Sequence, residues 1–97
     1  MDYKKLTKLQ STIEELRNRR GIKPRELESL AKALGRTRHS RGSEPNWVSE
    51  VFSDLRPVSI PHHGGRDINR FTAQSILDQL ELDVERHQAE LDKSMGR

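Results

Sequence analysis

The helical periodicity of this chain stops at Gly35 and does not return until about Asn69, and this break constrains the fold more than any other feature. The intervening residues 36–60 hold two prolines and short runs of β-branched and aromatic residues, which are typical of strands separated by turns. Helical patterns flank this segment on both sides. Because 97 residues suffice for one small domain, we expect the helices and strands to share a single core.

Three strands are expected in this segment, at residues 36–40, 46–52 and 58–60. In the third, Val58 and Ile60 alternate with Ser59, as in a half-buried strand. Pro57 and Pro61 stand on either side of it. Because proline cannot donate to a strand ladder, the third strand is predicted at the edge of the sheet.

Three helices are expected around the strands, at residues 3–20, at residues 24–34, and from a cap at Asn69 to about residue 91. The two terminal helices carry narrow apolar stripes with spacings of three and four residues. The stripe residues are Leu6, Leu9, Ile13 and Leu16 in the first helix and Leu77, Leu80 and Val84 in the last. These interaction stripes predict that the terminal helices pack on each other within one chain, with a homodimer as the alternative.

The order of elements predicts an α+β fold. Without the first helix the order is α-β-β-β-α, which places two helices on one face of an antiparallel sheet and matches double-stranded RNA-binding domains. Trp47 in the second strand is expected in the core, since the chain has only four aromatic residues. The chain then divides into an N-terminal helix (1–23), an α/β core (24–82) and a C-terminal helix extension with its tail (83–97).

Charge is distributed unevenly, although the net charge is only +3. Nine lysines and arginines lie between residues 17 and 41 against two glutamates, whereas six acidic residues lie between residues 78 and 92 against one arginine. A basic first half predicts contact with a polyanion such as RNA. Internal pairing of the basic segment with the acidic C-terminal helix is the alternative, and the sequence leaves both open.

Several classes of site are excluded or not expected. The chain has no cysteine, which rules out disulfides and thiolate metal sites, and we expect no metal and no cofactor. No stretch approaches the ~20 apolar residues that span a bilayer. The start, MDYKKLTKLQ, has no apolar segment behind its basic residues, so we expect no secretory signal and a cytoplasmic location.

Short segments between residues 24 and 82 follow one another in a characteristic order. They are Leu34-Gly35, Arg41-Gly42-Ser43, Val58-Ser59-Ile60-Pro61-His62-His63 and Thr72-Ala73-Gln74-Ser75-Ile76-Leu77. In this order and spacing they resemble the HicA toxins of bacterial toxin–antitoxin pairs. The resemblance implies a double-stranded-RNA-binding-domain-like fold, mRNA as the target, metal-independent endoribonuclease activity, and neutralisation by a HicB-type antitoxin.

The motif departs from that family at the position that matters for cleavage. In HicA toxins a histidine follows Gly-Ser, whereas Glu44 and Pro45 stand here. Loss of this histidine should reduce the cleavage rate severely, because a positioned acid–base group contributes ~10²–10⁴-fold to a rate. If residues 40–43 formed a hairpin loop, His39 would face Glu44 across the strand pair, with Glu44 as the base and His39 as the acid. The alternative is that both are solvated surface residues.

Other side chains are candidates for RNA contact. The alternation of Arg36, Arg38 and Arg41 predicts guanidinium groups on one strand face, directed toward phosphates. His62 and His63 either touch phosphate or shape the turn into the last helix. The sequence thus predicts an RNA-binding HicA-like toxin, either a divergent ribonuclease or an inactivated one. A non-catalytic interaction or RNA-binding module that uses the terminal helices is the alternative.

Overall fold

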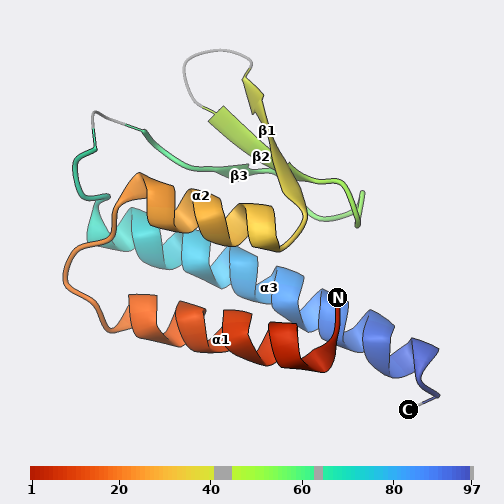
Figure 1. The fold of residues 1–97 in the computed structure, drawn as a ribbon. Helices are drawn as coiled ribbons and strands as arrows, with labels where there is room; N and C mark the ends of the chain where they lie inside the picture. Colours follow the sequence, from red (N-terminus) through yellow and green to blue (C-terminus); the bar gives the residue numbers. More distant parts are fainter. Residues whose placement is uncertain (41–44, 63–64, 97) are drawn as a thin grey trace.

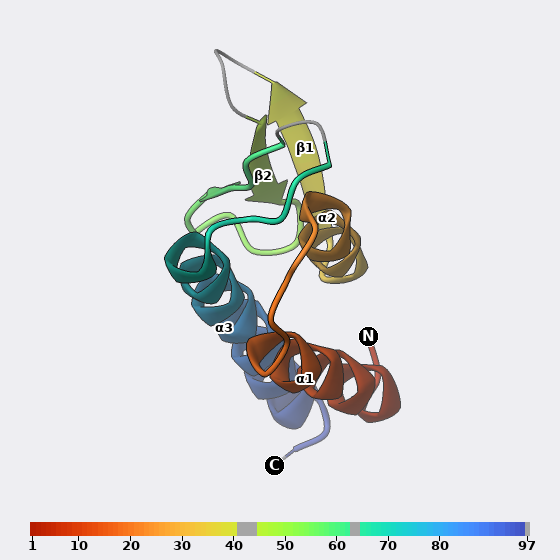
Figure 2. The ribbon, with the colours of Figure 1, turned by 90° about the vertical axis from the view of Figure 1, so that its left-hand side faces the viewer.

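Helices and strands form three layers in the computed structural model, which describes residues 1–40, 45–62 and 65–96 (Figure 1). The helices are α1 (Tyr3–Arg17), α2 (Pro24–Ala33) and α3 (Arg70–Ser94), and the strands are β1 (Arg36–Ser40), β2 (Pro45–Ser49) and β3 (Val58–Ser59). The sheet lies on one side of α2 and α3, and α1 packs on the opposite side of α3 (Figure 2). The fold is α+β, as the sequence predicts.

The sheet is antiparallel, with the strand order β1-β2-β3. Trp47 of β2 faces Arg38 on one side and Val58 on the other. The short β3 lies at the edge, which confirms the prediction from the flanking prolines. The second strand ends at Ser49 rather than at residue 52, because Ser49 Oγ accepts a hydrogen bond from the Phe52 amide at 3.0 Å and turns the chain.

Local sequence signals explain most helix ends. Proline begins α2, as predicted, and Gly35 joins it to β1 with a positive φ of 91° that favours glycine. The first helix is shorter than predicted: it ends at Arg17 instead of residue 20. Asn18 caps it, because Asn18 Nδ2 donates to the Glu14 carbonyl at 3.0 Å.

The apolar stripes of the two terminal helices lie in the core of one chain. All seven stripe residues are at most 8% exposed, and α1 runs antiparallel along α3 (Figure 1). The predicted packing of the terminal helices within one chain is therefore observed, and the homodimer stays a prediction. Trp47 is also in the core, at 2% exposure.

Ion pairs and hydrogen bonds border the seam between α1 and α3. Arg17 contacts Asp78 at 2.7 Å and Glu81 at 3.0 Å, and Gln10 Nε2 donates to Glu81 at 2.7 Å. Part of the basic first half is thus neutralised by the acidic C-terminal helix. In the part of the chain that the structure describes, no helix combines the length and the apolar character that crossing a membrane requires.

Candidate nucleic-acid interface

Arg36 does not face solvent, and its predicted contact with RNA is wrong. Its Nε and Nη2 donate to the two carboxylate oxygens of Asp83 at 2.7 and 2.8 Å, and Nη1 donates to the carbonyls of Trp47 and Arg56 at 2.8 and 2.9 Å. Arg36 is 3% exposed and Asp83 is fully buried. The reason is positional: Arg36 lies on the helix-facing side of β1, where α3 brings Asp83 within reach. This pair ties the sheet to α3.

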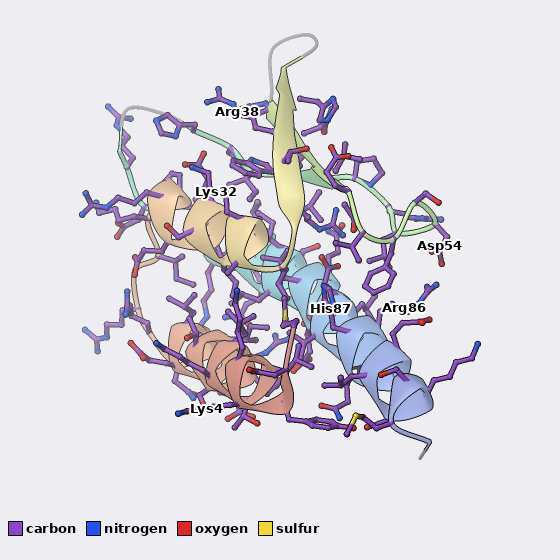
Figure 3. The ribbon with its side chains drawn as sticks, turned by 45° about the vertical axis from the view of Figure 1, so that its right-hand side comes forward. Lys4, Lys32, Arg38, Asp54, Arg86 and His87 are labelled. Atoms are coloured by element: carbon purple, nitrogen blue, oxygen red, sulfur yellow. The ribbon has the colours of Figure 1, made fainter. Side chains whose placement is uncertain are left out.

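Arg38 lies two residues further along β1 and is exposed. The hairpin carries it past the helices, so that it meets no carboxylate in the described ranges (Figure 3). With Lys32, Glu28 and Trp47 it lines a shallow hollow between α2 and β1. Arg38 is therefore exposed and without an ion pair among the described residues, and its contact with RNA stays a prediction. Arg41, the third predicted arginine, lies outside the described residues.

His39 and Thr37 share the opposite face of β1, which no helix covers (Figure 2). His39 Nε2 lies 3.4 Å from Glu50 Oε1, and the Thr37 hydroxyl donates to the same oxygen. These two contacts, Thr37 first and His39 second, lower the pKa of Glu50 below its ordinary value. The sequence did not predict Glu50 as a partner, because its place beside β1 depends on the strand register: Ser49 pairs with Arg36, and the Glu50 amide donates to the Gly35 carbonyl at 3.0 Å.

The predicted pairing of His39 with Glu44 fails on strand register. His39 lies opposite Asn46, and Ser40 lies opposite Pro45, so the connection is residues 41–44 rather than 40–43. Glu44 itself lies outside the described residues. The carboxylate that His39 meets in the structure is Glu50.

The contact between His39 and Glu50 limits the chemistry it can support. Cleavage by attack of the 2′-hydroxyl needs a base at the attacking oxygen and an acid at the departing oxygen, on opposite sides of phosphorus. Two groups 3.4 Å apart act as one proton-transfer unit rather than as that separated pair. The contact therefore does not supply the separated base and acid that efficient cleavage requires.

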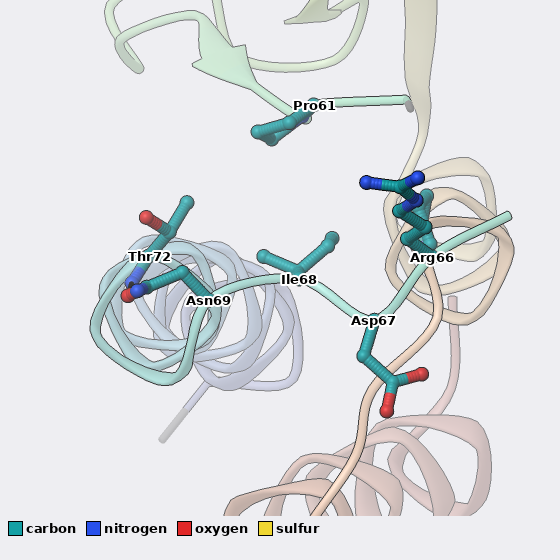
Figure 4. Close-up of a pocket in the computed structure, with 7 residues that line it drawn as sticks. Pro61, Arg66, Asp67, Ile68, Asn69 and Thr72 are labelled. Carbon is teal, nitrogen blue, oxygen red and sulfur yellow. Dashed lines mark hydrogen bonds between the residues drawn. The ribbon is translucent and has the colours of Figure 1, made fainter. Parts of the chain in front are cut away.

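A second hollow lies at the start of α3, lined by Pro24, Pro61 and Ile68 together with polar side chains (Figure 4). Arg66 rises beside it, whereas Asp67 points away toward α1 and contacts Lys23 Nζ at 2.9 Å (Figure 4). Asn69 caps α3, as predicted, by accepting from the Phe71 and Thr72 amides at 2.9 and 3.4 Å. This end of the molecule combines an apolar floor with a guanidinium group.

His62 lies at the same end, with Nδ1 3.4 Å from Glu28 Oε2. Its ring also borders a smaller hollow with Arg25 and Lys23. The exposed position of His62 is compatible with the predicted phosphate contact. His63, its predicted companion, lies outside the described residues.

Two kinds of residue at this end were missed from the sequence. Phe71 is an apolar residue in the first turn of α3, yet it is 86% exposed. Phe71 lies six residues before Leu77, which places it well away from the apolar stripe on the helix surface. The helical period alone could therefore have indicated that Phe71 is exposed. Arg25, Arg66 and Arg70 are exposed as well, and charge counting did not separate them from the paired arginines.

The cationic side chains divide into two groups. One group forms ion pairs with carboxylates of the chain: Arg17, Arg19, Lys23, Arg36 and Arg86. The other group has no ion pair within residues 1–40, 45–62 and 65–96. On α2, on β1, around β3 and at the start of α3, this second group consists of Arg25, Lys32, Arg38, Arg56, Arg66 and Arg70. The exposed lysines of α1 also lack ion pairs there, but they lie on the far layer, as Lys4 shows (Figure 3).

Within the described residues, no group of three or more histidine or acidic side chains is placed to hold a metal ion. No family model matches the chain, and neither the curated proteins nor the solved structures contain a match to it.

Proposed function

We propose that the chain is a HicA-like RNA-binding protein that contacts the RNA backbone through α2, the β1–β2 hairpin and the segment leading into α3. The observation that carries this proposal is the set of exposed arginines on these elements that have no ion pair in the described ranges. Arginine guanidinium groups bind phosphate oxygens in pairs, and neutralising phosphates supplies most of the affinity for nucleic acid. Arg17, Arg19, Arg36 and Arg86, by contrast, each form an ion pair with a carboxylate of the chain.

The arrangement of elements supports the same proposal. The order α2-β1-β2-β3-α3, with both helices on one side of the sheet, is the order used by double-stranded RNA-binding domains. The HicA-like motifs lie on these elements rather than on α1. By the resemblance, a HicB-type antitoxin would cover the RNA-contacting surface and neutralise the toxin.

Salt dependence and charge-neutralising variants test the proposal. RNA affinity should fall linearly with the logarithm of salt concentration. Arg38→Gln and Arg66→Gln should each reduce that slope by about one and weaken binding to every RNA sequence alike. Lys4→Gln is the matched control, since it removes the same charge from the far layer (Figure 3). Affinity that ignores salt, or an equal loss in Lys4→Gln, would contradict the proposal.

RNA cleavage is the second candidate function, because His39 and Glu50 form an acid–base pair on the exposed face of β1. Since the two groups act as one unit, we expect any cleavage to be slow. In this reaction the pair takes the proton of the 2′-hydroxyl and the 2′-oxygen attacks phosphorus. The bond from phosphorus to the 5′-oxygen breaks, the pair gives its proton to that oxygen, and a 2′,3′-cyclic phosphate remains. Purified protein in chelator should cleave RNA slowly if this is right. His39→Ala and Glu50→Gln should abolish the cleavage, and cleavage that survives both changes would exclude the pair.

A further inference from the structure

Trp47 lines the hollow between α2 and β1 and carries a buried donor. Its Nε1 is shielded from solvent and has no hydrogen-bond partner among the described residues, and the whole residue is only 2% exposed. A buried N–H without an acceptor destabilises a protein, and native structures retain few of them. We propose that this hollow binds one phosphate group of the RNA backbone, an inference that rests on the proposed function.

Two cations beside Trp47 have the chemistry for that ligand. Lys32 Nζ lies 5.8 Å from the centroid of the indole ring, and Arg38 borders the same hollow from β1. Neither has an ion pair in the part of the chain that the structure describes. A phosphate placed between them would accept charge-assisted hydrogen bonds from an ammonium and a guanidinium. Both side chains are exposed, and we expect them to shift when phosphate binds so that a phosphate oxygen reaches the indole N–H.

Glu28 also lines this hollow, and it is the one carboxylate among the lining residues. Its Oε2 lies 3.4 Å from His62 Nδ1, so its charge is partly engaged by a neighbour. It nevertheless opposes an anion in the hollow, whereas Lys32 and Arg38 attract one. Removing the negative charge should therefore strengthen phosphate binding, and removing either positive charge should weaken it.

The single tryptophan makes the site directly observable, because one indole N–H signal in an NMR spectrum reports it alone. Inorganic phosphate, titrated at constant ionic strength with chloride, should shift that signal saturably downfield as the N–H gains an acceptor. Lys32→Gln and Arg38→Gln should each raise the apparent dissociation constant about two- to fivefold, and Glu28→Gln should lower it by a similar factor. Lys4→Gln should leave it unchanged, because Lys4 lies on the far layer.

The outcomes separate this inference from the proposed function. An indole signal that responds neither to phosphate nor to an RNA oligonucleotide, while gel-shift assays still detect RNA binding, would overturn the phosphate site and leave the proposed function intact. A saturable phosphate response without any RNA binding would support the site and overturn the proposed function. A shift with uridine but not with phosphate would mean that a base occupies the hollow, and it would overturn the inference.

Discussion

Two arginines on the same side of β1 have opposite surroundings. Arg36 is 3% exposed and satisfied by Asp83 and two backbone carbonyls, whereas Arg38 is exposed and meets no carboxylate in the described ranges. They are separated by one residue, and their side-chain chemistry is identical. What differs is the neighbour: α3 brings an aspartate against the base of the strand, but it does not follow the hairpin outward (Figure 3).

This contrast extends to the whole molecule. Along the seam between α1 and α3, Arg17 contacts Asp78 and Glu81. On α2 and around the start of α3, Arg25, Arg66 and Arg70 are exposed without an ion pair in the described residues. The uneven charge of the sequence is therefore partly an internal pairing and partly a surface left open. A count of charges cannot distinguish the two, because the distinction depends on where the carboxylates lie.

Removal of the Arg36 partner should have the largest effect on stability. Asp83→Asn leaves a buried guanidinium without its counter-ion, and breaking such a pair typically costs about 3–5 kcal/mol. Urea denaturation followed by far-UV circular dichroism measures the loss. Arg38→Gln is the matched comparison on the exposed side, with an expected change within about 0.5 kcal/mol.

A double variant sharpens this comparison. Arg36→Met with Asp83→Leu replaces both charges by apolar groups, and such replacements are often neutral or stabilising by about 1–4 kcal/mol. Recovery of stability in the double variant would show that the single change fails because of an unpaired charge. Equal destabilisation by Asp83→Asn and Arg38→Gln would remove the distinction between the two arginines.

Most of the fold could be predicted from local patterns. Pro24, Gly35 and Asn69 marked helix boundaries because proline, glycine and asparagine each meet a backbone requirement that few other residues meet. The strand β1 and the edge position of β3 followed from the loss of helical period and from the prolines. The end of β2 could not be predicted, because it depends on a side-chain hydrogen bond of Ser49.

The site could be predicted only in part. Alternation along β1 correctly grouped Arg36 with Arg38, but it could not indicate which of them Asp83 would neutralise, since Asp83 lies 47 residues further along the chain. The prediction that His39 faces Glu44 was wrong for a similar reason. A two-residue difference in register exchanges one opposing side chain for another, and the observed register brings Glu50, which directly follows β2, to His39.

A second, smaller effect tests whether the layer between α1 and α3 is core rather than interface. Leu80 is fully buried, whereas Leu82 on the same helix is 57% exposed. Leu80→Ala should cost about 3 kcal/mol through lost burial and the resulting cavity. Leu82→Ala should be near neutral. Urea denaturation provides both values. Size-exclusion chromatography should give the same elution volume for the wild-type chain and both variants. A Leu80→Ala variant that is stable but changes its oligomeric state would instead support the homodimer.

The smallest effect concerns Arg86, which is paired like Arg36 but exposed. Arg86 Nη1 donates to Asp54 Oδ2 at 2.6 Å, and this contact lowers the pKa of Asp54 below its ordinary value of 3.8. A carboxyl whose pKa is lower in the folded state stabilises the fold above its unfolded pKa, and that contribution is lost as pH falls through the folded pKa. Asp54→Asn should therefore lower the urea midpoint slightly at pH 7, and the difference from the wild-type chain should disappear as the pH falls below the folded pKa of Asp54. Salt should also shrink it at pH 7, because exposed charges are screened. A difference that grows on acidification would contradict a stabilising pair between Arg86 and Asp54. A difference at pH 7 as large as the loss in Asp83→Asn would show that pairing, rather than burial of the pair, sets the stability that an arginine contributes here.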